Sequence, residues 1–306
     1  MRKRILKNME WGILICTVIL IIIGLVALFS ATQNSNYDEL KKQIVWIMVS
    51  IPILIAIIAI DYELLIKIAP ILYGIIILLL AGVLFTTPIN GATSWYNIGA
   101  VSFQPAELAK IVIILSLTYT IVKIQARGKK EINVIYKLAI ILGVAMVPVL
   151  LIIKQPDYGT AIAFIMALTV VIVAVPLLYF FILPEHAKTR IDVYLNPNLD
   201  PRGAGYNIIQ SKLAIGAGQL FGMGLLKGNQ TQLGFLYPKT TDFIFSVIGE
   251  ELGFIVAAGI IVLYVVLITK AIYVAKTAKD LEGSYIAAGI AGIFFFHMLE
   301  NIGMTM

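Results

Sequence analysis

Residues 11–30 read WGILICTVILIIIGLVALFS and carry no charged side chain. A helix rises 1.5 Å per residue, so about 20 such residues cross the roughly 30 Å hydrocarbon core of a bilayer. The apolar residues are continuous rather than alternating, which predicts a membrane helix and not a strand of a membrane barrel. The run is long enough to span and lacks a small-residue cleavage site, so we expect it to be retained.

The whole chain is likewise rich in apolar residues and poor in charged ones. It has 306 residues, of which 60% are hydrophobic and only 13% charged, with a mean hydropathy of +0.97. Soluble domains are about 25% charged, so this composition predicts an all-α polytopic integral membrane protein and argues against an ordinary soluble enzyme. With neither a linker nor a repeat evident, we expect one membrane domain over residues 1–306. Its other predicted spans are charge-poor: 43–60, 68–85, 106–122, 138–153, 159–183 (kinked or re-entrant), 252–269 and 284–299.

Basic residues predict the orientation. Lysines and arginines gather in residues 2–7, 123–137 and 270–279, which we expect on the cytoplasmic side under the positive-inside rule. The net charge of +6 therefore reflects topology rather than nucleic-acid binding. Lys41 and Lys42 fall on the expected outer side and oppose this signal slightly. The protein is expected in the plasma membrane, crossing it several times, with a cytoplasmic N-terminus.

One run breaks the alternation of sides. Residues 159–183 must leave and return on the same face, which needs two crossings, or roughly 34 residues. The run has only 25 residues. Either it bends near Pro176 as a kinked or re-entrant element, or this chain lacks a segment; the residues alone leave both open.

The extracytoplasmic segment of about 184–251 is too long for a simple connection. It is rich in Gly, Gln, Asn and Tyr and carries both signs of charge. This composition favours a polar ligand bound at the membrane surface, with a solvated cap as the alternative. Within the segment, residues 213–226 are apolar and rich in small residues, which predicts an interfacial or re-entrant helix.

Few side chains suit catalysis. Asp242 stands among aromatic residues before a span, where apolar neighbours favour a general base, although a helix N-cap fits equally well. Glu250 and Glu251 open the predicted span and would complement its helix dipole, a metal or cation role being the alternative. Glu107 and Lys110, at i and i+3, are expected to pair and to face the protein interior or an outer cavity, because charge in hydrocarbon costs about 2.5–3.5 kcal/mol.

A series of short motifs is spread along the chain. They are Gly91-Ala92 with Trp95, FQPAELAK at 103–110, QPD at 155–157 with Gly159-Thr160, Asn196-Pro197, Asp200-Pro201, GAGY at 203–206, QSKLAIG at 210–216, QTQL at 230–233, TDFIF at 241–245, GEELG at 249–253 and NIGM at 301–304. In their identity and order, these motifs resemble the RodA/FtsW family, also called SEDS proteins. Two of them, around Gln210-Ser211-Lys212 and Gln230-x-Gln232-Leu233, look more like the RodA branch. The resemblance implies a multi-helix membrane bundle with a long extracytoplasmic loop between the later spans.

The resemblance implies a peptidoglycan glycosyltransferase that polymerises lipid II, a disaccharide-pentapeptide on undecaprenyl pyrophosphate, into glycan strands for elongation and rod shape. Its implied partners are a class B penicillin-binding protein and elongation-complex membrane proteins, with no nucleic acid. Asp242 matches the family's catalytic acid. A pyrophosphate leaving group needs cations or a divalent metal such as Mg²⁺ or Mn²⁺, and no organic cofactor. The expected substrate-binding residues are Trp95, Gln104, Glu107, Lys110, Arg202, Lys212 and Lys239.

The chain departs from the family pattern in two places. It ends at Met306, before the family's last helices, and it lacks part of the family's sequence within 159–183. We therefore expect a fragment or a shortened form. Two other hypotheses are a lipid II flippase, disfavoured because the spans are nearly free of charge, and an inactive scaffold. Polymerisation of lipid II with and without the carboxylate of Asp242 would separate all three.

Overall fold

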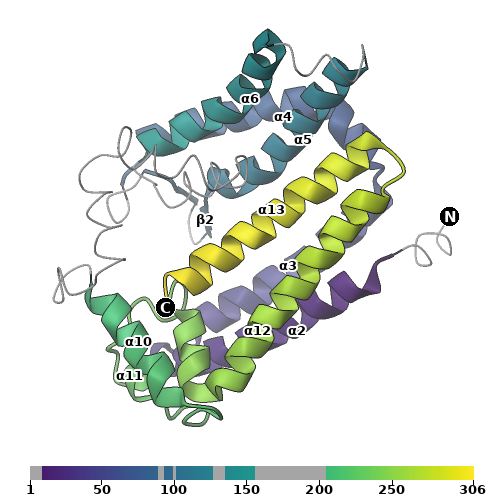
Figure 1. The fold of residues 1–306 in the computed structure, drawn as a ribbon. Helices are drawn as coiled ribbons and strands as arrows, with labels where there is room; N and C mark the ends of the chain where they lie inside the picture. The colour runs from purple at the N-terminus through teal and green to yellow at the C-terminus, as the bar shows by residue number, and fades with distance from the viewer. Residues whose placement is uncertain (1–8, 89–92, 99–100, 127–134, 156–204) are drawn as a thin grey trace. The chain divides into compact units, whose positions relative to one another are not determined.

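The computed structural model describes residues 9–88, 93–98, 101–126, 135–155 and 205–306 (Figure 1). The predicted span 159–183 with its bend at Pro176, residues 184–204 of the predicted outer segment, and Arg202 lie outside the described residues.

The described part of the chain forms two compact units. Unit 1 takes the described residues within Met1–Ile55, Pro176–Lys270 and His297–Met306, and unit 2 takes those within Ala56–Val175 and Ala271–Phe296. The expected single membrane domain stays a prediction.

Six described helices are long and apolar enough to cross a membrane. They confirm the predicted all-helical, multi-pass class. A further helix, α5 (Pro105–Gln125), has the length but is less apolar, because it carries Glu107, Lys110 and Lys123. The six are α2 (Trp11–Ala31), α3 (Asp38–Ala59), α4 (Tyr62–Gly82, continued by η2, Val83–Phe85), α6 (Ile135–Lys154), α12 (Ile244–Thr277) and α13 (Leu281–Gly303).

Several helices extend beyond the charge-poor runs that predicted them. α3 begins at Asp38 rather than at 43, and α12 covers Ile244–Thr277 rather than 252–269. α4 begins at Tyr62 rather than at 68, after an N-cap, Asp61, whose carboxylate accepts a hydrogen bond from the Glu63 amide at 3.2 Å. Charge-poor runs mark the part of a helix that suits hydrocarbon, while charged side chains at its ends remain compatible with the helical backbone.

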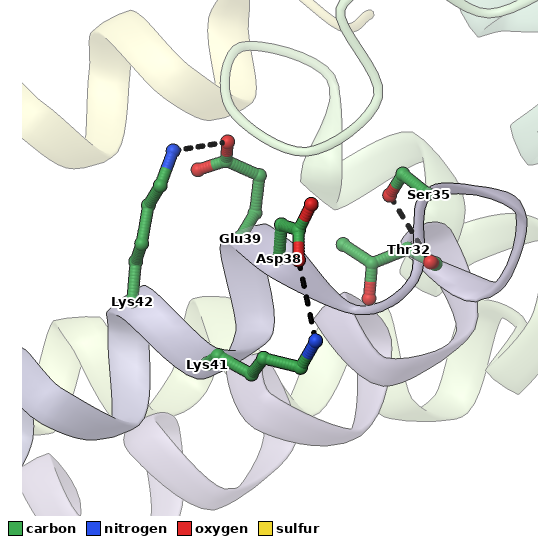
Figure 2. Close-up of polar contacts among 6 residues, drawn as sticks. All are labelled: Thr32, Ser35, Asp38, Glu39, Lys41 and Lys42. Atoms are coloured by element: carbon green, nitrogen blue, oxygen red, sulfur yellow. Dashed lines mark hydrogen bonds and ion pairs between the residues drawn. The ribbon is translucent and has the colours of Figure 1, made fainter. Parts of the chain in front are cut away.

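The start of α3 carries the two lysines that oppose the predicted orientation. Figure 2 shows Lys41 paired with Asp38 at 3.2 Å and Lys42 paired with Glu39 at 3.0 Å, each at i and i+3 on the helix. Each lysine therefore has a carboxylate beside it, and the turn carries no net charge. The positive-inside rule counts lysines and arginines rather than net charge, so Lys41 and Lys42 still oppose the predicted orientation slightly.

Unit 2 is built around the contact of α4, α5 and α6, whose shared core includes Leu80, Ile113 and Ile152. The uncharged loop before α5 contains a hairpin that the sequence did not predict, in which β1 (Tyr96–Ile98) pairs antiparallel with β2 (Val101–Phe103). The Tyr96 hydroxyl donates to the Leu79 carbonyl at 2.9 Å, which fixes the hairpin to the end of α4.

Unit 1 packs α2 against α12 through a core that includes Ala27, Phe245 and Ile260. α10 (Tyr206–Gly218) and α11 (Asn229–Gln232) lie beside the start of α12 (Figure 1).

The two ends of α2 meet different parts of unit 1. Glu10, just before α2, forms an ion pair with Lys270 at 3.4 Å. Beyond the other end, the Asn34 amide donates to the Gln232 carbonyl at 3.1 Å. Residues 10 and 270, both expected on the cytoplasmic side, thus share one end of the unit.

The helix expected over 213–226 begins and ends earlier in the chain. α10 starts at Tyr206 and ends at Gly218, so only the first part of the apolar stretch is helical. Gln219, Gly222, Gly224 and Leu226 all have positive φ, a conformation that interrupts a helix. Small residues here serve a tight turn rather than a continued helix.

Candidate active site

A break in α12 organises the candidate site. Gly253 has φ 82° and ψ 177° inside the helix. The turn after α10 fits into this break: the Met223 amide donates to the Glu250 carbonyl at 2.9 Å, and the Phe254 amide donates to the Gln219 carbonyl at 2.8 Å. A Cβ at Gly253 would collide with the backbone of this turn, so the position requires glycine for space as well as conformation.

Glu250 is fully buried and anchors the segment that carries α11. Its carboxylate accepts hydrogen bonds from the Gln230 amide at 2.7 Å, the Thr231 amide at 3.0 Å and the Thr231 hydroxyl at 2.6 Å. Three donors satisfy the buried charge without an ion pair among the described residues. Gln230 itself keeps a buried side-chain oxygen with no hydrogen-bond partner in that part of the chain.

Glu251 is 1% exposed and binds the same segment. Its carboxylate accepts from the Leu226 amide at 3.1 Å, the Gly228 amide at 3.3 Å and the Gln232 side-chain amide at 2.9 Å. The prediction that these two glutamates complement the first turn of a helix is therefore wrong. They lie about two turns into α12, beside its break, and their charges are directed at residues 226–232.

Lys239 is joined to the same cluster. Its ammonium donates to the Thr231 carbonyl at 2.7 Å. Burial lowers the pKa of Lys239, and the charges of Glu251 and Glu250 oppose that shift. Sequence reasoning selected Lys239 for its charge but missed Thr231, whose signal was only its place in the Gln-Thr-Gln-Leu motif.

Asp242 is exposed and lies two residues before the start of α12. Within the described residues its carboxylate makes no hydrogen bond and no ion pair. An N-cap would accept a hydrogen bond from an amide of the first turn, so the capping alternative has no support here. The neighbouring Phe243 is buried against Ala31 and Leu236, which fixes the backbone while leaving the carboxylate accessible.

Other candidates in unit 1 are less informative. Lys212 lies exposed on α10. The residue before it, Ser211, is buried, and its hydroxyl contacts the Ser246 hydroxyl and the Thr305 carbonyl, each at 2.6 Å. α10 is thus fixed to the unit through Ser211, and Lys212 faces away from that contact.

The remaining candidates belong to unit 2. Glu107 and Lys110 form the expected ion pair at 2.8 Å, with Lys110 8% exposed and Glu107 56% exposed. Lys110 is therefore buried and Glu107 exposed, and the prediction that the exposed carboxylate of Glu107 faces an outer cavity rather than lipid stays a prediction. Gln104 is the N-cap residue of α5 and Trp95 is exposed just before β1. A cavity shared by Asp242 with Lys110 or Trp95 remains a prediction.

No group of three or more His, Cys, Asp or Glu side chains in the described ranges could hold a metal ion. The expected divalent metal therefore stays a prediction.

Comparison with known proteins connects this arrangement to a family. A family model for FtsW, RodA and SpoVE, described as cell cycle proteins, matches residues 10–306. The peptidoglycan glycosyltransferase MrdB of Escherichia coli K12 is 38% identical over 256 residues, covering 78% of this chain and 68% of that protein. The probable peptidoglycan glycosyltransferase FtsW of Trichlorobacter lovleyi is 34% identical, and the alignment covers 98% of this chain and 84% of that protein.

Solved structures agree with the sequence matches. One solved chain aligns with a TM-score of 0.80 and 26% identity, covering 97% of this chain and 87% of that one. It comes from a structure described as "Structural coordination of polymerization and crosslinking by a peptidoglycan synthase complex". The crystal structure of Thermus thermophilus rod shape determining protein RodA aligns with a TM-score of 0.68 and 27% identity, covering 97% and 85%.

Proposed function

Because this chain belongs to the FtsW/RodA/SpoVE family of cell cycle proteins, we propose that it is a peptidoglycan glycosyltransferase with Asp242 as its general base. The observation that carries this role is the accessible carboxylate of Asp242, which makes no hydrogen bond or ion pair within the described ranges, on a backbone fixed by buried neighbours. A base must approach the hydroxyl that it deprotonates to hydrogen-bond distance, and a carboxylate already used as a cap would be less able to do so.

The proposed substrate is lipid II. An acceptor sugar hydroxyl attacks the anomeric carbon of the donor, and its proton passes to the Asp242 carboxylate. A new glycosidic bond forms while the bond between the anomeric carbon and the phosphate oxygen breaks, and the electron pair leaves with undecaprenyl pyrophosphate. Pyrophosphate is a stable anion, so the reaction needs positive charge near the leaving group more than it needs a strong acid.

The proposed setting is the outer surface of the plasma membrane. The end of unit 1 that carries Asp242 is the one reached by Asn34, whereas Glu10 and Lys270 meet at the other end. With the N-terminus in the cytoplasm, Asp242 would face outward, where lipid II is polymerised. A class B penicillin-binding protein and other elongation-complex membrane proteins are the proposed partners, supported by the similarity to a peptidoglycan synthase complex.

The remaining substrate contacts are also proposals. Trp95 would stack on a sugar ring or line a groove for the lipid. Gln104, with the ion pair of Glu107 and Lys110, would complete a polar site at the start of α5. A divalent metal, if required, would bind between a carboxylate and the substrate phosphates, as Mg²⁺ usually does. Chelator addition and Mg²⁺ or Mn²⁺ restoration in the polymerisation assay test that requirement.

The test is polymerisation of lipid II by the purified chain together with its penicillin-binding partner. Asp242→Asn keeps the shape of the side chain and removes the base, so we expect a loss of about 10²–10⁴-fold in rate. Asp38→Asn, which changes an exposed, ion-paired aspartate in the same unit, is the matched control and should retain wild-type rate. A fully active Asp242→Asn protein would remove Asp242 from the mechanism, and lipid II translocation without polymer would favour a flippase.

A further inference from the structure

We propose that Glu250 and Glu251 are positioning residues: by holding residues 226–232, they fix the ammonium group of Lys239 as a ligand of the substrate's pyrophosphate. This inference rests on the proposed function and extends it, because it assigns a role to two buried acids that do not face the substrate.

The contacts form a short continuous path. Lys239 donates to the carbonyl of Thr231, and the amide and hydroxyl of that same residue both donate to Glu250. On either side of Thr231, the Gln230 amide donates to Glu250 and the Gln232 side chain donates to Glu251. A shift of the Glu250 carboxylate therefore moves the residue to which the ammonium is bound, while Glu251 holds residues before and after it.

The ammonium group retains capacity for a ligand. It has three N–H donors, and the Thr231 carbonyl is the only hydrogen-bond partner recorded for it within the described ranges. No ion pair neutralises it in that part of the chain. Thr231 lies between Lys239 and the acids, so the carboxylates favour the charged form of the lysine without occupying its donors.

The position of this cation suits a leaving group. Lys239 is three residues before Asp242, so their Cα atoms are at most about 11 Å apart even in a fully extended chain. A base at the acceptor hydroxyl and a cation at the departing pyrophosphate need this kind of spacing, because the two act on opposite sides of one anomeric carbon. Lys227, in the same segment, is exposed and has no described contact with either acid.

The experiment measures lipid II polymerisation by the purified chain with its partner, together with inhibition by undecaprenyl pyrophosphate. For Lys239→Met we expect the KM for lipid II and the inhibition constant to rise together by about 10–100-fold, the worth of a charged hydrogen bond. Lys239→Arg should stay near wild type. Lys227→Met, which also removes one positive charge, should change neither constant.

Glu250→Gln tests the positioning step. It should raise the same two constants, and the double variant with Lys239→Met should be no worse than Lys239→Met alone, because both changes remove one interaction. If the Gln variant does not fold, Glu250→Asp keeps the charge and displaces it by one methylene. A purely structural role would reduce the amount of folded protein but leave both constants of the folded fraction unchanged, which would overturn the inference.

The proposed function and this inference fail in different ways. Absence of any wild-type polymerisation would contradict the proposed function. Wild-type KM and inhibition constants in Lys239→Met, in a protein that needs Asp242, would contradict the inference alone.

Discussion

Thr231→Val tests how strongly the buried acids hold their segment. Valine has nearly the shape of threonine but cannot donate to Glu250, so the 2.6 Å hydrogen bond is lost while both residues stay fully buried. Hydrogen bonds to charged groups contribute about 1.5–3 kcal/mol. Two backbone donors, from Gln230 and Thr231, still satisfy the carboxylate. We therefore expect unfolding to become easier by about 2 kcal/mol, roughly 30-fold in the equilibrium constant.

The assay is reversible unfolding of the purified chain in mixed detergent micelles, followed by circular dichroism. Thr17→Val is the matched control, because the Thr17 hydroxyl donates only to the neutral Ile13 carbonyl one turn earlier in α2. Such a bond within a helix contributes little, so we expect a change below about 0.5 kcal/mol. Equal effects of the two substitutions would show that the charge of Glu250 adds nothing to the hold on residue 231, and would refute the reasoning.

Three further predictions concern packing, topology and pH. A Cβ at Gly228 would come within 2.6 Å of the Glu250 carboxylate, so Gly228→Ala should destabilise the fold by about 1–3 kcal/mol in the same unfolding assay. Its control is Gly216→Ala, in open space on α10, which should be neutral or stabilising by up to about 1 kcal/mol. With the native cysteine replaced, Tyr237→Cys should react with a membrane-impermeant thiol reagent on intact cells and Lys279→Cys only after lysis; the reverse pattern would invert the topology. Hydrogen bonds from a backbone amide and a tyrosine hydroxyl hold the pKa of Asp280 below its usual value of 3.8. The contribution of Asp280 to stability is therefore present above about pH 4 and is lost as pH falls through the lowered pKa. In Asp280→Asn, the free energy of unfolding should depend less on pH in this acidic range.

Much of the fold could be predicted from composition alone. A long continuous apolar run crosses a bilayer as an α-helix, so the sequence predicted the membrane helices, and the family motifs predicted the bundle. The boundaries were less accurate, because an exposed ion pair such as Lys41–Asp38 is compatible with a helix although it ends a charge-free run. Enzyme class and family agree with the relatives, while the individual substrate contacts remain untested.

The acids of the candidate site were the harder case. Glu250 and Glu251 precede an apolar run, a pattern that usually marks the start of a helix. Their actual role depends on residues 226–232 folding back from about 20 positions earlier, a long-range contact that no local pattern records. The turn and the break approach each other closely at Gly218, Gly222 and Gly253, where a Cβ would collide with backbone, and the sequence did not show that these glycines meet.

The hydrogen bonds at the break in α12 explain why the turn after α10 and the motif around Gly253 occur together. An interrupted helix exposes amides and carbonyls that no lipid can satisfy, and each would cost several kcal/mol near hydrocarbon. Here the carbonyls of Glu250 and Glu251 accept from the amides of the turn after α10, while the amides of Phe254 and Ile255 donate to carbonyls of that same turn. The exchange is reciprocal, so neither the break nor the turn is stable without the other. The short helical segment that begins two residues after Asp242 is thereby held at its far end, and the accessible carboxylate is presented by a rigid element rather than by a free loop.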